Sequence, residues 1–493
     1  KSAAAHFLAK AHLFRASELH DSWNSQYKDA DLAAVIKYGD EVIKKHPLCS
    51  NFQELWDYTE PDGANEQVSE VVLAAQFSDN SDSWGRFGNQ MHLCFPSVYQ
   101  NLAGMKRDIS GDREFSYVSS TEYTIQVFDR VNDSRFWKSF ITKYGCNYTN
   151  GAPKWDAEVM AKNPDEYTAE DVAGEHRFVG GQIGLKYIVN NPGDTRFTPG
   201  HDKNGNESKS EDFVLKNGKV CPEHTFVRYY AGQPFQWNTA KDNSTHSGNY
   251  YTIYPHNRGV ALSKFRDGAR NSIASQFGTR DAIIARSADD VLMVAEAYIR
   301  KKDYSNAIKY LNMVRDRAGY AEGEDRSISR DGQAYKKNSV CTNKGGGFSA
   351  EGAIYTEENT YFESNNIPVT TAATKSSMHL NSVDDILNSE ADKPIYEALK
   401  CNTEAEKIMC FLLNERTREL IGESQRWEDL ARTKTLEARW NAFNDGSQRG
   451  IGKFDPAKHY YRPIPQSFLD GITNANGASL SNEEKEKMQN PGY

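Results

Sequence analysis

The sequence has no long apolar run and no excess of positive charge. No stretch reaches the roughly 18 consecutive apolar residues of a membrane-spanning helix, so no such helix is predicted. The 59 lysines and arginines are outnumbered by 68 aspartates and glutamates, which gives a net charge of −9. A negative chain lacks the basic field that attracts nucleic acid, so a nucleic-acid partner is not expected. Hydrophobic residues make up only 38% of the chain, which predicts a large share of loop.

The sequence also lacks the spacings of a disulfide framework, a metal site or a catalytic motif. Its cysteines form no C-x-x-C pair and are odd in number, so at least one thiol is expected to be free. The seven cysteines are Cys49, Cys94, Cys146, Cys221, Cys341, Cys401 and Cys410. No H-E-x-x-H or G-x-S-x-G motif is present, and the glycine run at 345–347 lacks the context of a phosphate loop. These absences argue against an enzyme, and no cofactor is expected.

The clearest pattern that is present predicts two helices folded against each other over residues 287–319. Ser287 and Asp290 have the spacing of a capping box, which predicts that the serine starts the first helix. Apolar residues then recur at intervals of three and four, so each helix is expected to have one apolar stripe. Four positions follow the small-and-large order of a tetratricopeptide unit of about 34 residues: Ala295, Tyr298, Ala307 and Leu311. Such units must stack to bury their faces, although a lone helical hairpin would give the same local pattern.

The rest of the chain alternates between helical segments and long loops. Further helices are predicted over 2–19, 31–46, 120–144, 383–400 and 403–439. The first of these is expected to turn one face inward, formed by Phe7, Leu8, Ala11 and Phe14. The β-rich stretch 67–77 predicts a strand, and short strands are expected within 146–281. The predicted fold is mainly α, with stacked tetratricopeptide-like helix pairs, long loop insertions and a few short strands.

These segments predict a single domain over residues 1–493. Its helical scaffold is expected over 1–58, 120–145, 286–320 and 383–440. The loop-rich excursions are expected over 59–119, 146–285 and 321–382, with a tail over 441–493. A helical scaffold that holds a loop surface is therefore the predicted organisation.

Several of these stretches together resemble the SusD/RagB family of outer-membrane nutrient-binding lipoproteins of Bacteroidetes. The matching stretches begin with AAAHFLAKAHLFRA at 3–16, NDSRFWKSF at 132–140 and LSKFRDGAR at 262–270. They continue with 278–319, NERTRELIGESQRWEDLART at 414–433, YRPIPQS at 461–467 and the terminal QNPGY. Their order along nearly the whole chain makes the resemblance much more specific than any one motif.

The resemblance implies stacked helix pairs that support a variable loop layer, on a lipid-anchored protein at the cell surface. It also implies a partner, a SusC-like TonB-dependent barrel that receives oligosaccharide or peptide from the loop layer. Family members carry a sizeable segment, starting with the lipidated cysteine, before the stretch that matches residues 3–16. Since neither is seen here, we expect the anchor, part of the scaffold and part of the binding surface to lie outside this chain.

Two carboxylates on one predicted helix offer an alternative function. Glu415 and Glu419 lie four residues apart, so both are expected on one helix face and could serve a glycosidase. The competing interpretation is a buried ion-pair network with Arg416, Arg418 and Arg426. Because an acid catalyst needs an apolar setting to raise its pKa, the crowd of arginines favours the structural interpretation.

Clusters of aromatic and amide side chains in the loops are the candidate ligand surface. An exposed indole can stack on the C–H face of a sugar, while arginine or asparagine bonds to hydroxyl or peptide groups. The candidate residues are Trp84, Arg86, Phe87, Asn89, Phe235, Trp237, Asn238 and Tyr251. Aromatic residues in loops also cap a core or anchor a protein interface, and both alternatives stay open.

An oxygen-rich loop around Asp202, Asn204 and Asn206 is a weak candidate for structural calcium. Its glycine, Gly205, is misplaced for an EF-hand, so a solvated turn is the favoured interpretation. The sequence as a whole thus predicts a nutrient-capturing binding protein rather than an enzyme. The alternatives are a helical carbohydrate-active enzyme that uses Glu415 and Glu419, and an assembly scaffold without a small ligand.

Overall fold

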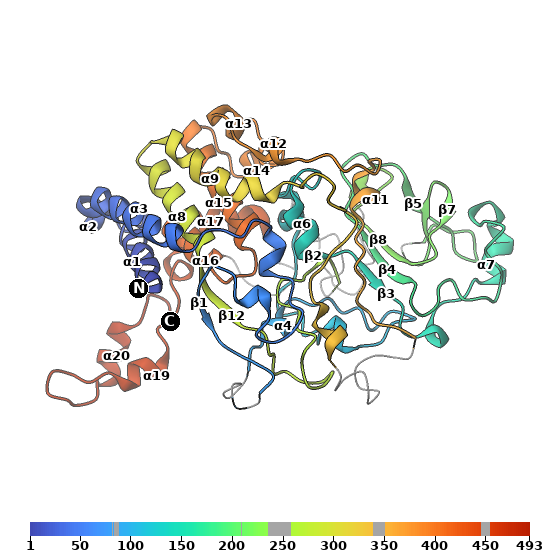
Figure 1. Ribbon diagram of the computed structural model, residues 1–493, viewed down its shortest axis with the longest axis horizontal. Coiled ribbons are helices and arrows are strands. Elements are labelled where there is room, and N and C mark those ends of the chain that lie inside the picture. The colour runs from blue at the N-terminus through green and yellow to red at the C-terminus, as the bar shows by residue number, and fades with distance from the viewer. Residues whose placement is uncertain (81, 83–87, 209, 235–257, 339–350, 445–453) are drawn as a thin grey trace.

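The computed structural model covers residues 1–493 and describes all of them except 81, 83–87, 209, 235–257, 339–350 and 445–453. Helices gather in one half of the molecule, around α8 and α9, and most of the short strands lie in the other half (Figure 1). The fold is mainly α with a few short strands, which confirms the predicted fold class. Within the described residues, no helix is both long and apolar enough to cross a bilayer.

Four long helices form a stack in the helical half (Figure 1). They are α1 (Ser2–Arg15), α3 (Lys28–Lys45), α8 (Ser287–Arg300) and α9 (Tyr304–Ala318). Each packs on the next in that order, so residues near the N-terminus lie beside residues from the middle of the chain. Since α8 is in contact with both α3 and α9, the prediction of stacked helix pairs is confirmed.

Gly39 allows α3 to approach α8 closely. A Cβ atom at this position would lie 2.4 Å from Cγ2 of Val294, closer than any real contact. We expect Gly39→Ala to lower the free energy of unfolding by about 1–3 kcal/mol, because overpacking outweighs the gain in helix propensity. Urea unfolding measures the effect. The control Gly471→Ala adds a methyl group where nothing lies within 4 Å and should leave stability unchanged, and equal stability of both variants would contradict the packing argument.

The start of α8 differs from the predicted capping box. The N-cap is Arg286 in an extended conformation, and Ser287 already lies inside the helix. Asp290 accepts a hydrogen bond from the His6 ring at 2.8 Å instead of pairing with the serine. The helix is also buried on nearly all sides rather than along one stripe, because α1, α3, α9 and α15 (Glu404–Leu420) pack around it. A capping box relies on side chains of the first turn alone, whereas this start is enclosed by partners from distant segments.

The buried face of α1 also differs from the prediction. Ala5, Ala9 and Leu13 face the neighbouring helices, whereas Phe7, Leu8 and Phe14 are 42%, 42% and 38% exposed. The small alanines let α1 approach α3, and the buried His6 is held by its bond to Asp290, so the helix is rotated away from its largest apolar residues.

The strands form small sheets rather than one large one. Strand β1 (Val71–Ala75) pairs antiparallel with β12 (Ala282–Arg286), which runs directly into α8. This confirms the strand predicted within 67–77. A second sheet joins β3 (Lys143–Gly145), β4 (Ile183–Ile188) and β8 (His224–Val227), with β4 and β8 parallel. The other strands are β2 (Phe140–Ile141), β5 (Phe197–Pro199), β6 (Val214–Lys216), β7 (Lys219–Val220), β9 (Tyr229–Tyr230), β10 (Gln233–Pro234) and β11 (Ala261–Leu262).

Most remaining helices are short, and three predicted long helices are broken. The prediction over 120–144 is wrong, because α5 (Glu122–Gln126) and α6 (Ser134–Ser139) are separate and Asp133 caps α6. The segment 383–400 divides into α13 (Val383–Leu387) and α14 (Lys393–Ala398). The predicted helix over 403–439 ends after α15, because Gly422 takes a left-handed conformation with a φ of 82°.

The following helices complete the described fold. They are α2 (Asp21–Asn24), α4 (Met91–Cys94), α7 (Ala157–Lys162), α11 (Tyr361–Asn365), α12 (Lys375–Met378), α16 (Arg426–Arg432), α17 (Leu436–Phe443), α18 (Pro456–His459), α19 (Gln466–Gly471) and α20 (Asn482–Met488). Single 3-10 turns also occur, including η2 (Phe52–Leu55).

Candidate functional site

The first candidate site is the carboxylate pair on α15, and Glu419 pairs with three arginines. Its carboxylate oxygens form ion pairs with Nη1 of Arg286 at 2.7 Å, Nη2 of Arg317 at 2.6 Å and Nη1 of Arg135 at 3.0 Å. These arginines come from β12, α9 and α6, so one side chain ties three separate segments to α15. Glu419 is completely buried.

Glu415, one turn earlier, has a similar environment. It accepts hydrogen bonds from Arg315 and Arg418, both at 2.9 Å, and lies 2.7 Å from Nη2 of Arg135. Arg135 thus bridges the two glutamates. The predicted ion-pair network is present, and Arg418 is part of it.

The other two arginines expected around Glu415 and Glu419 have different partners. Arg416 pairs with Asp289 at 2.7 Å and Asp429 at 2.6 Å, while Arg426 donates to the backbone carbonyl of Leu413. Arg416 points away from the two glutamates, because neighbouring residues on a helix do not share a face. Arg426 lies on a separate helix, α16.

The arginines keep both glutamates ionised. Burial alone would raise the pKa of Glu415, but the charges of Arg135, Arg315 and Arg418 outweigh it and lower that pKa to about 2. The pKa of Glu419 is lowered in the same way, by Arg317, Arg286 and Arg135 against burial. A general acid must hold a proton near neutral pH, so this pair has the electrostatics of a structural network rather than of a glycosidase.

The lowered pKa values predict acid sensitivity. A carboxylate whose folded pKa is depressed stabilises the fold fully above its unfolded pKa and loses that contribution as the pH falls. For Glu415 the window runs from its ordinary value of 4.5 down to about 2. We therefore expect the free energy of unfolding to fall as the pH drops below that ordinary value. Urea unfolding at a series of pH values measures it, and stability that is flat or rises toward acid would contradict the network.

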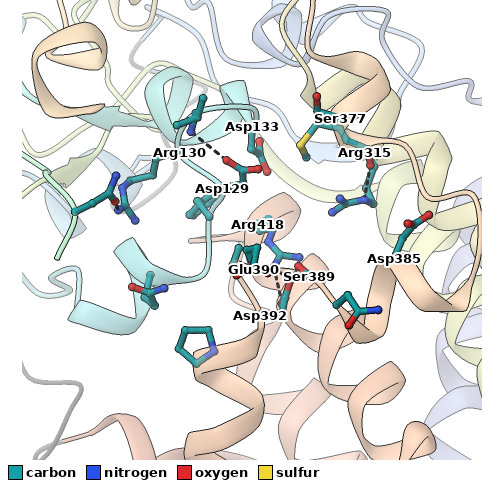
Figure 2. Close-up of a pocket in the computed structure, with 18 of the residues that line it drawn as sticks. Asp129, Arg130, Asp133, Arg315, Ser377, Asp385, Ser389, Glu390, Asp392 and Arg418 are labelled. Atoms are coloured by element: carbon teal, nitrogen blue, oxygen red, sulfur yellow. Dashed lines mark hydrogen bonds and ion pairs between the residues drawn. The ribbon is translucent and has the colours of Figure 1, made fainter. Parts of the chain in front are cut away.

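The second candidate site is a polar pocket of about 930 Å³ at the surface (Figure 2). One wall comes from α5 and the turn after it, and the other from α12 to α14. Figure 2 shows Asp129, Arg130 and Asp133 on one side and Ser377 and Asp385 across the pocket. The remaining polar lining includes Glu122, Gln126, Asn191, Arg315, Asn365, Asn381, Asn388, Ser389, Glu390, Asp392, Glu397 and Arg418.

Fixed ion pairs and hydrogen bonds hold the lining in place. Arg418 contacts both oxygens of the buried Asp392 at 2.6 Å, and Ser389 donates to the same carboxylate at 2.6 Å. Across the pocket, Arg130 donates to the backbone carbonyl of Ile125 at 2.8 Å. Its burial and the nearby Arg228 lower the pKa of Arg130 to about 9. Such a lining can offer hydrogen bonds to hydroxyl or amide groups of a polar ligand.

Of the candidate ligand-binding residues, Asn89 lies within the described part of the chain, and it is not among the residues that line this pocket. The other seven candidates lie outside the described residues: Trp84, Arg86, Phe87, Phe235, Trp237, Asn238 and Tyr251. Asn89 is buried, and its Nδ2 donates to the carbonyl of Arg280 at 2.7 Å while Oδ1 accepts from Met91 at 2.9 Å. Asn89 thus holds its loop in place, and the ligand-binding assignments stay predictions.

Sequence reasoning missed the pocket because its walls are far apart in the chain. One signal was available, the polar run SSMHLNSVDDILNSEAD at 376–392, which supplies most of one wall. Nothing in that run points to the segment 126–133 that forms the other wall.

The oxygen-rich loop at Asp202 forms a hydrogen-bonded turn. Oδ1 of Asp202 accepts from the backbone N–H groups of Asn204 at 2.8 Å and Asn206 at 3.0 Å, and these bonds lower its pKa. Among the described residues, no group of three or more His, Cys, Asp or Glu side chains is placed to hold a metal ion. The calcium alternative stays a prediction.

The fold and these two sites define a helical-repeat scaffold that carries loop insertions and a polar surface pocket. The chain belongs to the SusD family, whose model matches residues 55–493. This confirms the family resemblance that the sequence motifs indicate. A search of curated proteins finds no match.

Solved structures, among them two SusD superfamily proteins, are similar over most or all of this chain. A SusD superfamily protein from Parabacteroides distasonis is 15% identical with a TM-score of 0.43, covering 100% of this chain and 63% of that one. One from Bacteroides fragilis is 13% identical with a TM-score of 0.40, covering 100% and 65%. Surface glycan-binding protein A from Bacteroides thetaiotaomicron, in complex with laminarihexaose, is 15% identical with a TM-score of 0.38, covering 94% and 60%. The chain thus spans less than two thirds of each of these proteins.

Proposed function

We propose that this protein captures nutrient oligosaccharides, or oligopeptides, at the cell surface and delivers them to a SusC-like TonB-dependent barrel. The observation that carries the proposal is membership of the SusD family over residues 55–493. In this proposal the protein is held at the outer membrane by a lipid anchor, and the barrel supplies the transport step.

Capture requires only non-covalent contacts in the loop layer. Aromatic rings such as Trp84 and Trp237 would stack on sugar rings, and amide side chains near them in the sequence would bond to hydroxyl groups. The polar pocket beside Asp385 and Asn388 offers a second surface for the same hydroxyl-rich ligand. Several weak contacts of this kind give modest affinity, with Kd between about 1 µM and 1 mM.

The enzymatic alternative draws no support from α15. Glu415 and Glu419 are both 0% exposed, so a substrate cannot reach them without unfolding their surroundings. They are also ionised and occupied by arginines. The proposed mechanism therefore contains no hydrolytic step.

Calorimetric titration against a panel of oligosaccharides and oligopeptides tests the proposal. We expect saturable heat with at least one class of oligomer and a stronger response to longer chains, because several contacts act together. A parallel titration in the presence of a purified cognate barrel shows whether the site binds weakly by itself or needs the barrel to be complete. Silence across the panel under both conditions would contradict capture and favour the assembly scaffold.

A further inference from the structure

The polar pocket has more unpaired negative charge than positive charge. Within the described chain, three carboxylates of its lining form no ion pair: Asp129, Asp385 and Glu397. The other four carboxylates of the lining each have an arginine or lysine partner. The lining arginines Arg315 and Arg418 are also paired, whereas Arg130 donates to the carbonyl oxygens of Ile125 and Asn191. The pocket therefore keeps a net negative charge.

The unpaired carboxylates lie on both walls and are held in place. Asp129 is on one wall and Asp385 lies across the pocket from it (Figure 2), while Glu397 is on α14, which belongs to the same wall as Asp385. Each aspartate accepts two backbone N–H bonds from its own turn, at 3.1 and 3.2 Å for Asp129 and at 2.6 and 3.2 Å for Asp385. A cation that enters the pocket thus meets fixed negative groups from both sides.

Two buried oxygen atoms of the lining also lack a hydrogen-bond donor. Glu122 and Asn365 are 7% and 8% exposed, and neither Oε2 of Glu122 nor Oδ1 of Asn365 accepts a hydrogen bond from the described residues. Against these two acceptors, Nε of Arg130 is a lining donor without an acceptor. Buried polar atoms without partners are costly, so a ligand that brings N–H groups into the pocket would offset the shortage of donors.

We propose that the pocket binds an organic ammonium group, and that it selects positively charged oligomers among the nutrients that the protein captures. The inference rests on the proposed function and narrows its ligand class. The ammonium group lies between Asp129 and Asp385 and donates its N–H groups to their carboxylates. Because these carboxylates stand on separate walls rather than around one point, an organic cation suits them better than a metal ion.

The ammonium group can belong to an amino sugar or to a lysine side chain of a peptide. The pocket volume of about 930 Å³ is within the range of small-molecule sites, so it has room for the sugar or peptide unit that carries the amine. Sulfated or carboxylated oligomers are repelled by the same unpaired charges.

Calorimetry with two matched pairs of probes tests the charge selection. The trimer of glucosamine is compared with the trimer of N-acetylglucosamine, and trilysine with the same peptide acetylated on its side chains, at mildly acidic pH. We expect at least one charged probe to bind about 10-fold more tightly than its neutral partner at low salt. The difference should shrink as sodium chloride is added. The pair that shows it identifies the source of the amine.

A double variant checks that the preference arises in the pocket. Asp129→Asn with Asp385→Asn removes both facing charges but keeps an oxygen for the backbone N–H groups, so the 10-fold preference should disappear. The control Glu483→Gln with Glu486→Gln removes two exposed charges from α20 and should keep the preference. A preference that persists in the pocket variant would overturn the proposal.

Carbodiimide coupling of the glucosamine trimer to the wild-type protein gives a test that needs no variant. The reagent joins an amine to a carboxylate that it contacts. Trypsin leaves Asp129 in peptide 114–130 and both Asp385 and Glu397 in peptide 376–400. We expect the sugar on these two peptides at concentrations that leave the carboxylates of α20 unmodified. Even labelling of all exposed carboxylates would overturn the proposal.

The same measurements separate this inference from the proposed function. If neutral oligomers bind as tightly as their charged partners, the charge selection is wrong and nutrient capture stands. If no probe of the two pairs binds but another oligomer of the wider panel does, the result is the same. If no oligomer binds at all, both proposals fail.

Discussion

Replacing Glu419 with glutamine is expected to lower the free energy of unfolding by about 3–5 kcal/mol. The glutamine would have nearly the same shape but no charge, and it would leave Arg135, Arg286 and Arg317 facing one another with less compensation. Removing one partner from a buried ion-pair network is strongly destabilising, because it leaves a buried charge without compensation. This loss is far larger than the stability that the intact network adds over an apolar core of the same volume. Urea unfolding followed by circular dichroism measures the loss.

An exposed ion pair provides the matched control for this prediction. Glu483 pairs with Lys487 on α20, and both side chains are largely exposed. Glu483→Gln should leave the free energy of unfolding almost unchanged, because water screens such pairs. If Glu419→Gln were as stable as this control, the network would not be what holds α15 to its neighbours.

The second large effect is expected in ligand binding. The double variant Trp84→Ala and Trp237→Ala should weaken binding of the best oligosaccharide in the panel by about 10- to 100-fold. Each indole lost from a sugar-stacking surface removes roughly 1 kcal/mol or more, and the two losses multiply in the binding constant. Calorimetry with the purified variant measures the change, while its melting temperature checks that it is folded.

A tryptophan elsewhere on the surface serves as the control for that change. Trp23 on α2 is 52% exposed and stacks on His20 at 5.7 Å. Trp23→Ala removes an exposed indole from the helical scaffold rather than from the loop layer, so binding should be unchanged. Equal loss in this variant, or no loss in the double variant, would mean that the loops at 84 and 237 are not the ligand surface.

The helix pairs were predictable because their information is local. Alternating small and large residues over 287–319 determine how two neighbouring helices pack, and the structure follows that pattern in α8 and α9. The details that failed depend on distant partners. The predicted capping box is displaced because Asp290 pairs with His6, and the predicted face of α1 is wrong for the same reason.

In the candidate sites, too, local features were predictable from the sequence and distant partners were not. The spacing of Glu415 and Glu419 correctly predicts a shared buried network, since a helix places residues four apart on one face. Sequence alone could not identify Arg135, Arg286 or Arg317 as the partners, because each reaches Glu419 from another element. The polar pocket was likewise invisible, since its two walls meet only in the folded chain.

The central claim is that this protein captures its ligand and leaves it chemically intact. Its most direct test is mass spectrometry of the oligomer that gives the strongest calorimetric heat, after prolonged incubation with the purified protein. The account predicts an unchanged chain length at every protein concentration. Shorter products that accumulate in proportion to the protein would contradict it and would make the protein an enzyme.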